Sequence, residues 1–222
     1  MVYSTSPPLF TPMRSADLDC ITVDAYGTLV SLENPLPGLE RGLRERGIDR
    51  SSEEVATAFR AELDYYREHS LEGRDGDSLL RLRRESCGVF LNSLDTELDP
   101  DDFLNDFVAA LCFRVEEGAV DALRLAKSRG LALAVVSNWD CSLEQRLEEV
   151  GLREFFDCVV SSASVGAAKP DPRVFLYALE QLSATPARAL HIGDTEDDRA
   201  GAEAAGMHFS WAPLANALGG LS

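Results

Sequence analysis

The sequence predicts a doubly wound α/β fold, a parallel sheet covered by helices on both faces, with an α-helical cap inserted into it. Apolar strand-like segments alternate with helical patterns in the second half of the 222-residue chain. Strands that alternate with helices of this length imply βαβ crossovers, which build a parallel sheet. The segment after the first strand, residues 34–114, shows helical patterns only. A helical insertion in an α/β core is therefore the predicted architecture.

The predicted strands of the core are short and strongly apolar. The first covers residues 18–23 and is followed at once by Asp24. The other strands are 131–136, 158–160, 187–192 and 207–211, and the predicted helices are 119–128, 143–150, 173–182 and 199–205. Gly130 stands between a predicted helix and the next strand, where glycine commonly ends a helix.

The inserted segment carries four amphipathic patterns, over residues 36–46, 52–69, 77–94 and 101–113. Ser51, Ser52 and Asp99 are of the types that cap helix N-termini. Because such helices bury their apolar faces against one another, the insertion is predicted to pack like a bundle. We predict an N-terminal tail at 1–16, a core made of 17–33 and 115–222, and a helical cap at 34–114.

Composition limits the partners that we expect. The formal net charge of −17 argues against nucleic acid, because phosphate binding requires a basic face. No apolar stretch reaches the roughly 18 residues that span a bilayer, and residues 1–15 lack the apolar region of a signal peptide. The five cysteines show no metal-ligand spacing, as is typical of reduced thiols in the cytoplasm. A cytoplasmic protein without a nucleic-acid or membrane partner is expected.

Polar side chains follow the predicted strands where each strand ends. They are Asp24, Ser137, Asn138, Lys169, Asp194 and Asp198. Because the carboxyl ends of parallel strands meet at one edge of a sheet, we expect these groups to converge there. Three carboxylates at one place repel each other, so positive charge must lie among them. Lys169 supplies one charge, and Mg²⁺ is an oxygen-binding cation suited to the remainder.

The chain resembles the haloacid dehalogenase (HAD) hydrolase superfamily in four motifs that occur in order. They are Asp24-Ala-Tyr-Gly-Thr28-Leu, Ser137-Asn138, Lys169-Pro-Asp-Pro and Gly193-Asp194-Thr-Glu-Asp-Asp198. The helical insertion lies between the first and second motifs, where one type of cap domain lies in that superfamily. The resemblance implies a Rossmann-like core with a helical cap, and a small anionic substrate.

The resemblance also implies a role for each matching residue. Asp24 is expected to attack the substrate and form a covalent intermediate, while Lys169 neutralises the developing charge. The phosphoryl oxygens are expected to be held by Thr28, Ser137 and backbone N–H groups of the turn at Tyr26 and Gly27, with help from Asn138. The expected Mg²⁺ ligands are Asp24, Asp194 and the Tyr26 carbonyl, with Asp198 as a ligand or a group behind the ligands.

Tyr26 departs from the phosphatase pattern. Phosphatases of this superfamily carry an aspartate at this position, which protonates the leaving alkoxide and activates water, and such acid-base help contributes ~10²–10⁴-fold. A neutral phenol with a reference pKa of about 10 is a poor base. A halide leaving group needs no proton, and Asp-Ala-Tyr-Gly-Thr-Leu also resembles the 2-haloacid dehalogenases.

Asp194 favours the phosphatase over the dehalogenase. The dehalogenases characteristically carry Ser-Ser-Asn in place of Gly193-Asp194-Thr195 and work without metal. An additional carboxylate is best explained by a bound cation, which suits phosphoryl transfer. We therefore expect a Mg²⁺-dependent phosphatase, with a metal-independent 2-haloacid dehalogenase and a non-catalytic binding protein as the alternatives.

Several of these residues have a purely structural alternative. Asp24 could cap a turn, Ser137 and Asn138 could cap the helix that begins near residue 142, and Lys169 could be a solvated loop residue. Trp139 could line the site or pack in the core. Arg81, Arg83 and Arg84 could meet an anionic substrate, although a row of arginines on a helix is more often solvated. His191, in an apolar strand, is interpreted as a core residue, and Tyr65 and Tyr66 as helix packing.

Overall fold

The computed structural model describes residues 17–219, so the predicted tail at 1–16 lies outside the described residues. The core is a five-stranded parallel sheet in the order β5-β4-β1-β6-β7. Its strands are β1 (Cys20–Val23), β4 (Ala132–Ser137), β5 (Cys158–Ser161), β6 (Ala189–Gly193) and β7 (His208–Trp211). The predicted doubly wound α/β fold is confirmed.

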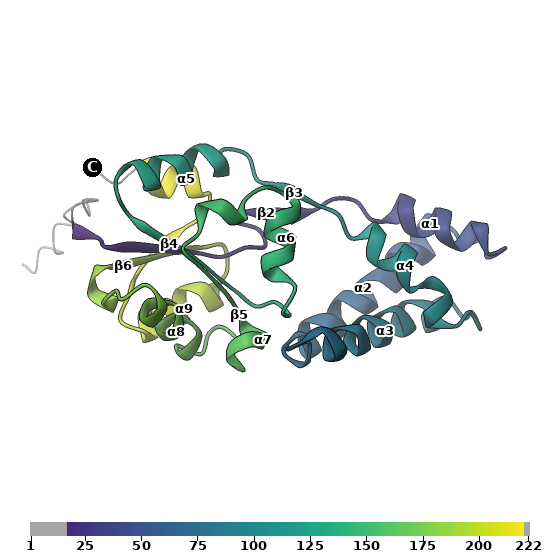
Figure 1. The fold of residues 1–222 in the computed structure, drawn as a ribbon. Helices are drawn as coiled ribbons and strands as arrows, with labels where there is room; N and C mark the ends of the chain where they lie inside the picture. Colours follow the sequence, from purple (N-terminus) through teal and green to yellow (C-terminus); the bar gives the residue numbers. More distant parts are fainter. Residues whose placement is uncertain (1–16, 220–222) are drawn as a thin grey trace, which may run out of the picture.

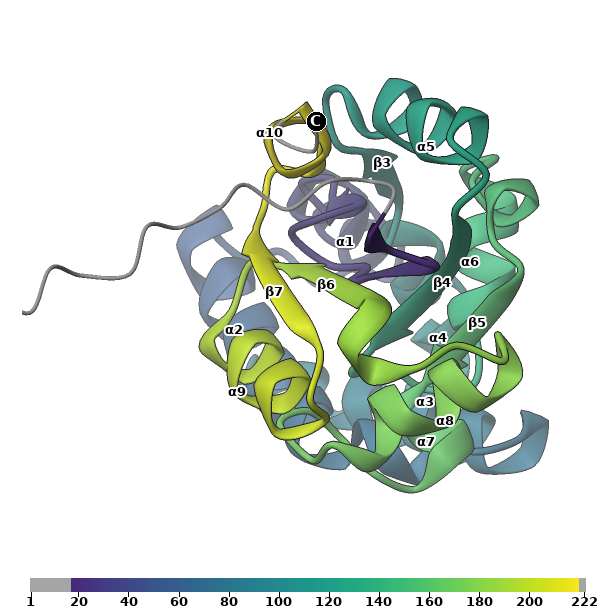
Figure 2. The same cartoon turned by 90° about the vertical axis from the view of Figure 1, so that its left-hand side faces the viewer.

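Helices cover both faces of this sheet (Figure 2). One layer contains α5 (Ala119–Ser128), α6 (Leu143–Glu149) and α10 (Leu214–Gly219). The opposite layer contains α8 (Arg173–Gln181) and α9 (Glu196–Ala204), with the short α7 (Ser162–Val165) nearby. The four residues of β1 are buried completely because the strand lies at the centre of the sheet, between the two helical layers.

Alternation along β1 divides its side chains between two apolar clusters. Ile21 and Val23 pack in the cluster that includes α5 and α6, whereas Cys20 packs in the cluster of α8 and α9. Successive strand residues point to opposite faces, so Thr22 lies on the same face as Cys20. This face also receives His191, the neighbour of Thr22 on β6.

Four helices form a separate part of the molecule between the second and third strands of the chain (Figure 1). They are α1 (Leu36–Glu45), α2 (Ser52–His69), α3 (Gly76–Asn92) and α4 (Pro100–Ala110). Phe90, Phe103 and Phe107 lie at the centre of their own apolar cluster. Ser51 and Asp99 cap α2 and α4, as predicted, and Ser52 is the first residue of α2. We refer to α1 to α4 as the cap.

Two short strands connect core and cap and were not predicted. They are β2 (Val30–Leu32) and β3 (Phe113–Val115), which pair antiparallel. The predicted helix over 101–113 ends at Ala110, and Phe113 belongs to β3 instead. Three residues are too few to show strand periodicity in the sequence. Only the pairing of β2 with β3 in the folded protein shows that they are strands.

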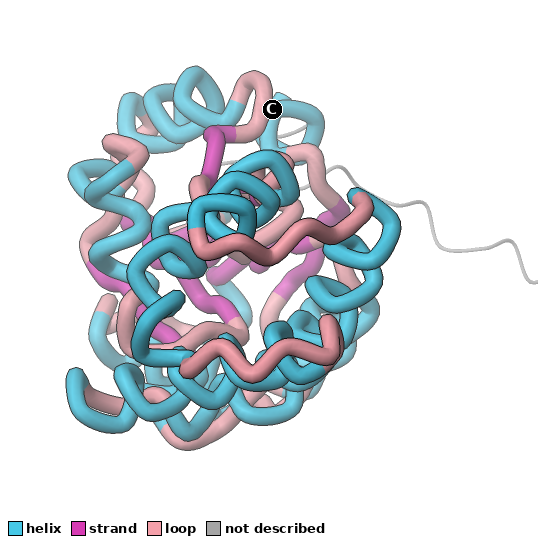
Figure 3. The backbone as a smooth tube through the Cα atoms, turned by 90° about the vertical axis from the view of Figure 1, so that its right-hand side faces the viewer, coloured by secondary structure: helices cyan, strands magenta, loops and turns pink. Residues whose placement is uncertain are grey.

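The cap stands over the edge of the sheet at which the parallel strands end (Figure 3). The cap also touches the core through the short helix η2 (Ser70–Glu72), which connects α2 and α3 and packs beside α7. The backbone N–H of Cys141 donates to the Gly73 carbonyl across this contact, at 2.8 Å. Within residues 17–219, every helix is too short or too polar to cross a membrane.

Candidate active site

The sequence-predicted residues meet at the carboxyl edge of the sheet. Asp24 follows β1 directly, Ser137 is the last residue of β4, and Asp194 follows β6. The backbone N–H of Asp24 donates to the Ile192 carbonyl at 2.9 Å, which fixes the end of β1 against β6. The convergence expected from the strand ends is therefore present in the fold.

The Asp24 carboxylate is held by one of its two oxygens. Oδ1 accepts a hydrogen bond from the Ser137 hydroxyl at 2.9 Å and lies 2.5 Å from Lys169 Nζ. Both of these contacts are made to Oδ1, and the Asp194 side chain also lies within hydrogen-bonding reach of the Asp24 carboxyl group. Burial raises the pKa of Asp24, while the charge of Lys169 opposes that increase. Ser137 and Lys169 thus anchor one oxygen of this side chain.

Lys169 lies buried between two carboxylates. Its Nζ is 2.5 Å from Asp24 Oδ1 and 2.5 Å from Asp198 Oδ1. Burial alone would lower the pKa of Lys169, but the two carboxylates raise it above the usual value, so the ammonium form is favoured. The Asn138 side chain holds the lysine backbone, with Oδ1 accepting from N–H at 2.7 Å and Nδ2 donating to the carbonyl at 3.1 Å.

Asp198 is fully buried and its hydrogen-bonding capacity is filled. Oδ1 accepts from Lys169 Nζ at 2.5 Å and from His191 Nε2 at 2.9 Å. Oδ2 accepts from the backbone N–H and the hydroxyl of Thr195, at 3.1 and 2.5 Å. A carboxylate offers about four lone-pair positions, and all four are occupied here. Of the two roles predicted for Asp198, this arrangement favours the one behind the ligands, in which it orients Lys169.

These donors also determine the charge of Asp198. Burial by itself would raise its pKa, but the hydrogen bond from His191 and the charge of Lys169 hold the pKa well below its usual range. A Cβ atom at Gly193 would lie 2.3 Å from Asp198 Cγ, so the glycine of the fourth motif makes room for this carboxylate. Asp198 is therefore an ionised group at a fixed position.

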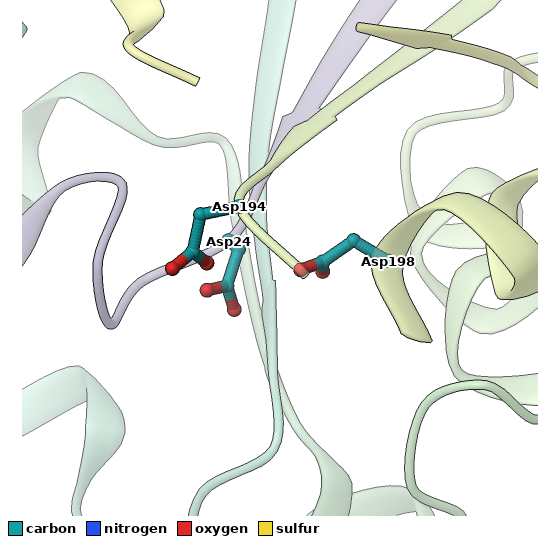
Figure 4. A group of neighbouring side chains, drawn as sticks. All are labelled: Asp24, Asp194 and Asp198. Atoms are coloured by element: carbon teal, nitrogen blue, oxygen red, sulfur yellow. The ribbon is translucent and has the colours of Figure 1, made fainter. Parts of the chain in front are cut away.

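Asp194 is the exposed carboxylate of the site. Figure 4 shows it beside Asp24, with Asp198 reaching toward both from the start of α9. Oxygens of the three carboxylates lie within 4.8 Å of one another. Burial raises the pKa of Asp194, and the negative charge of Asp198 raises it further. Unlike Asp198, this residue has no cationic partner among the described residues.

Gly27 allows Asp194 to approach the loop that follows β1. Its φ of +82° lies in the left-handed region, and a Cβ atom there would be 2.2 Å from Asp194 Oδ2. The carbonyl of the preceding Tyr26 accepts no hydrogen bond from residues 17–219. Asp24 Oδ2, Asp194 and this carbonyl are oxygen donors of the kind that Mg²⁺ prefers, so the residues present fit the predicted cation.

A match to a known family identifies the family to which the chain belongs. The family model described as haloacid dehalogenase-like hydrolase matches residues 18–206. The chain belongs to this family. It is therefore a hydrolase, and the superfamily predicted from the four motifs is confirmed.

Two similar proteins match this hydrolase over different lengths. The mouse haloacid dehalogenase-like hydrolase domain-containing protein 3 is 47% identical over 109 residues, which are 49% of this chain and 43% of that protein. The match thus spans less than half of that relative. A pyrimidine 5'-nucleotidase of Escherichia coli is 31% identical over 196 residues, covering 87% of this chain and 85% of that one.

A solved structure of a dehalogenase is also similar to this hydrolase. The L-2-haloacid dehalogenase of Xanthobacter autotrophicus, with chloropropionic acid covalently bound, superimposes with a TM-score of 0.63. It is 26% identical, and the match covers 86% of this chain and 76% of that one. Because a nucleotidase and a dehalogenase are both similar to this hydrolase, the reaction has to be argued from the side chains of the site.

Two further residues of the hydrolase's first motif differ in exposure. The Thr28 hydroxyl is buried and has no hydrogen-bond partner within residues 17–219. Buried polar groups are usually paired, so this oxygen is free to meet a substrate or water. Tyr26, by contrast, is 50% exposed.

The structure rejects several of the alternatives left open by the sequence. Ser137 and Asn138 bind Asp24 and Lys169 rather than capping a helix, and α6 begins after Ser142. Lys169 is buried rather than solvated. Trp139 packs in the core, with its ring 5.2 Å from that of Phe113. Arg84 pairs with Asp101 inside the cap at 2.5 Å.

Sequence reasoning missed two partners of the site. His191 is buried in the core, as the sequence predicts, but its contact with the site was not predicted: Nε2 lies 2.9 Å from Asp198 Oδ1. The Tyr66 hydroxyl in cap helix α2 donates to Asp140 Oδ2 at 2.8 Å, directly beyond the second motif. A histidine inside an apolar strand requires a hydrogen-bonding partner, and this was the available signal for His191. Nothing in the sequence pairs Tyr66 with Asp140.

Proposed function

We propose that this hydrolase is a Mg²⁺-dependent phosphatase of small phosphorylated metabolites that works through an aspartyl-phosphate on Asp24. The observation that supports it is the pair formed by Asp24 and the exposed carboxylate of Asp194, in which Ser137 and Lys169 contact Asp24 only at Oδ1. A second carboxylate without a cationic partner would only repel an anionic substrate, so it is best explained by a metal ion. The similarity to a pyrimidine 5'-nucleotidase over 87% of the chain agrees with this assignment.

In the proposed reaction, Asp24 Oδ2 forms a bond to phosphorus while the bond to the leaving oxygen breaks. Ser137 and Lys169 hold Oδ1, which fixes the direction of Oδ2. The Lys169 charge balances the negative charge that develops during transfer. Asp24, Asp194 and the Tyr26 carbonyl would hold Mg²⁺, which would supply further charge neutralisation. Water then releases phosphate from Asp24.

Thr28 and the turn around Gly27 are proposed to receive the phosphoryl oxygens. The Thr28 hydroxyl is suited to this because it is buried and unpaired within the described residues. Ser137 has a single O–H, which already points at Asp24, so its contact with the phosphoryl group requires a rotation of that hydroxyl. Asn138 uses both polar atoms on the Lys169 loop, and direct substrate contact by this residue stays a prediction.

Dehalogenation of a 2-haloacid is the second candidate. It is favoured by Tyr26 in the first motif and by the similarity to the Xanthobacter enzyme. In that reaction Asp24 would displace halide from carbon, and no proton would be needed on the leaving group. Asp194 has no evident task in it, which is why we favour phosphate transfer.

An activity assay separates the two reactions. Purified protein is tested with an aryl phosphate and with 2-chloropropionate, each with Mg²⁺ and with EDTA. We expect phosphate release that EDTA abolishes and that Asp24→Asn removes. Halide release that is insensitive to EDTA would replace the phosphatase with the dehalogenase, and no turnover on broad panels of both would favour a non-catalytic protein.

The presence of Tyr26 at this position predicts that the rate of phosphate release depends on the leaving group. Without an aspartate at this position, aryl phosphates should be cleaved much faster than alkyl phosphates, whose alkoxide needs a proton. Tyr26→Asp should raise kcat/KM for an alkyl phosphate by about tenfold or more, and for an aryl phosphate by less. Tyr26→Phe is the matched control. An equal change for both substrates would contradict the assigned role.

The remaining features of the proposal concern its setting. The buried ammonium group of Lys169 fits a small anionic substrate, and the net charge of −17 fits the absence of a nucleic-acid partner. We propose a cytoplasmic location without a membrane partner. Identifying the substrate requires a panel of phosphorylated metabolites, beginning with nucleoside monophosphates.

A further inference from the structure

We propose that Thr22 and His191 form a buried positioning pair that fixes the Asp198 carboxylate and, through it, Lys169. This inference rests on the proposed function for its kinetic consequence, but its structural part can be tested without any activity. Neither residue belongs to the four motifs, and the alternative is that both simply fill the core. The two possibilities predict different effects of conservative substitutions.

The two residues are partners in the sheet register. Thr22 on β1 lies opposite His191 on the neighbouring strand β6, and both are completely buried. Thr22 Oγ1 lies 2.8 Å from His191 Nδ1, and His191 Nε2 lies 2.9 Å from Asp198 Oδ1. The imidazole therefore bridges a hydroxyl deep in the sheet and a carboxylate of the site.

The hydrogen-bonding chemistry sets the tautomer of His191. An ionised carboxylate only accepts, so the nitrogen that faces Asp198, Nε2, must carry a proton. The only hydrogen-bond partner of the Thr22 hydroxyl within residues 17–219 is Nδ1. A buried hydroxyl that donated to nothing would be costly, so Thr22 donates and Nδ1 accepts. Thr22 thus selects the tautomer that serves Asp198.

Aromatic contacts hold the imidazole plane in place. The Phe175 ring meets it edge-on, with centroids 4.8 Å apart and an interplanar angle of 82°. Phe209 lies on β7 with its centroid at 6.3 Å. Phe175 reaches this position because residue 201 is glycine, where a Cβ atom would be 2.4 Å from the phenyl ring. Packing and hydrogen bonds thus restrict the ring to one orientation.

Successive contacts connect five side chains, from Thr22 through His191, Asp198 and Lys169 to Asp24. His191 Nε2 and Lys169 Nζ share Asp198 Oδ1, and Lys169 then contacts Asp24 Oδ1. Without the imidazole donor, Asp198 would keep its Thr195 contacts but lose one of the two donors at Oδ1. Lys169 would then be held less firmly, and the loss should appear in the chemical step.

Substitutions that keep or remove each polar atom test the pair. His191→Leu removes the donor, whereas His191→Gln keeps an N–H near the position of Nε2. Loss of a group that orients a charged ligand typically costs 10–100-fold, so we expect a drop in kcat of about that size for His191→Leu, with KM changed by less than about threefold. His191→Gln should recover most of the lost kcat. His208→Leu, at an exposed histidine on β7, is the control that leaves kcat unchanged.

Thr22 is tested by a second matched pair. Thr22→Val keeps the shape and removes the hydroxyl, so it should lower kcat, by less than His191→Leu does. Thr22→Ser keeps the hydroxyl and should recover most of the loss. Equal kcat in His191→Leu and the unchanged protein would overturn the proposal. So would equal losses in His191→Leu and His191→Gln, because packing alone would then explain them.

Nitrogen NMR tests the pair without turnover. The chain has three histidines, so ¹⁵N-histidine labelling with His191→Gln as the assignment control identifies the His191 signals. We expect a protonated Nε2 and an unprotonated Nδ1, and loss of this single tautomer in Thr22→Val. A protonated Nδ1 as the only tautomer would overturn the pair. If the phosphatase assay fails, this spectrum still decides the inference, and if His191→Leu does not fold, the Thr22 variants remain.

Discussion

Asp198 in the core and Glu62 in the cap are both buried carboxyl groups, but their pKa values are shifted in opposite directions. Asp198 is 0% exposed and accepts four hydrogen bonds, one of them from Lys169. Glu62 is 3% exposed on α2 and has no ion pair among the described residues. The pKa of Asp198 is held well below its usual range, whereas burial raises the pKa of Glu62 to about 7.

The difference shows where a buried charge is required. In the core, the proposed reaction needs an ionised Asp24 and a fixed Lys169, and Lys169 lies between the carboxylates of Asp24 and Asp198. In the cap, burial outweighs the opposing effect of the Ser86 hydroxyl on the pKa of Glu62, so the neutral form is the less costly one. Two substitutions test this contrast, Lys169→Met in the core, with the larger expected effect, and Glu62→Gln in the cap.

Removing the core cation should have the largest effect. Lys169→Met leaves Asp24 and Asp198 without their compensating charge, and breaking a buried pair in this way typically costs about 3–5 kcal/mol. The folded-state pKa values of both carboxyls should rise, so the loss should grow as the pH rises from acidic to alkaline. Urea unfolding in EDTA at pH 5 and pH 8 measures this, and a deficit that is larger at pH 5 would contradict it.

Neutralising the cap carboxyl should have the opposite sign. Folded Glu62 keeps its proton up to about pH 7, whereas the ordinary pKa of a glutamate, which applies to the unfolded chain, is 4.5. The folded state therefore binds the additional proton in that window, and stability falls as the pH rises through it. Glu62→Gln should stabilise the protein by about 2–3 kcal/mol at pH 8 and by little near pH 4.5.

The matched control for Glu62 lies on the same helix. Glu68 is exposed, so Glu68→Gln should change the free energy of unfolding by less than about 0.5 kcal/mol at either pH. Destabilisation by Glu62→Gln at pH 8 would show that the buried carboxyl has a favourable partner in the cap, and the contrast with Asp198 would not hold.

A smaller effect is expected where the two regions meet. Tyr66 donates to Asp140 across the boundary, and burial raises the pKa of this phenol well above its usual value, which keeps the donor protonated. Tyr66→Phe should weaken the contact by about 1–2 kcal/mol. Amide hydrogen exchange at Cys141, whose N–H donates to Gly73 across the same boundary, should become faster.

The neighbouring tyrosine provides the comparison for this test. Tyr65 donates to Glu85 at 3.1 Å within the cap and does not reach the core. Tyr65→Phe should therefore leave exchange at Cys141 unchanged. If both variants speed the exchange equally, the cause is a general loosening of α2, and Tyr66 does not hold the cap to the core.

Much of the core could be predicted from the sequence because its signals are local. The strand periods, the glycine after α5 and the order of the four motifs are properties of neighbouring residues. They led to the α/β fold, to the four cap helices and to the convergence of Asp24, Lys169 and Asp194. The antiparallel pair of β2 and β3 was not predicted, because its two strands are short and far apart in the chain.

The sequence by itself determined which chemical groups stand at the ends of the strands, since alternating apolar runs fix those ends. Only the tertiary structure decided how the groups are held. Thr22 and His191 are 169 residues apart, and Tyr66 and Asp140 are 74 apart. Their hydrogen bonds depend on strand register and on how the cap packs against the core. A hydrogen bond needs two atoms about 3 Å apart, and no local pattern specifies that distance for residues so far apart in the chain.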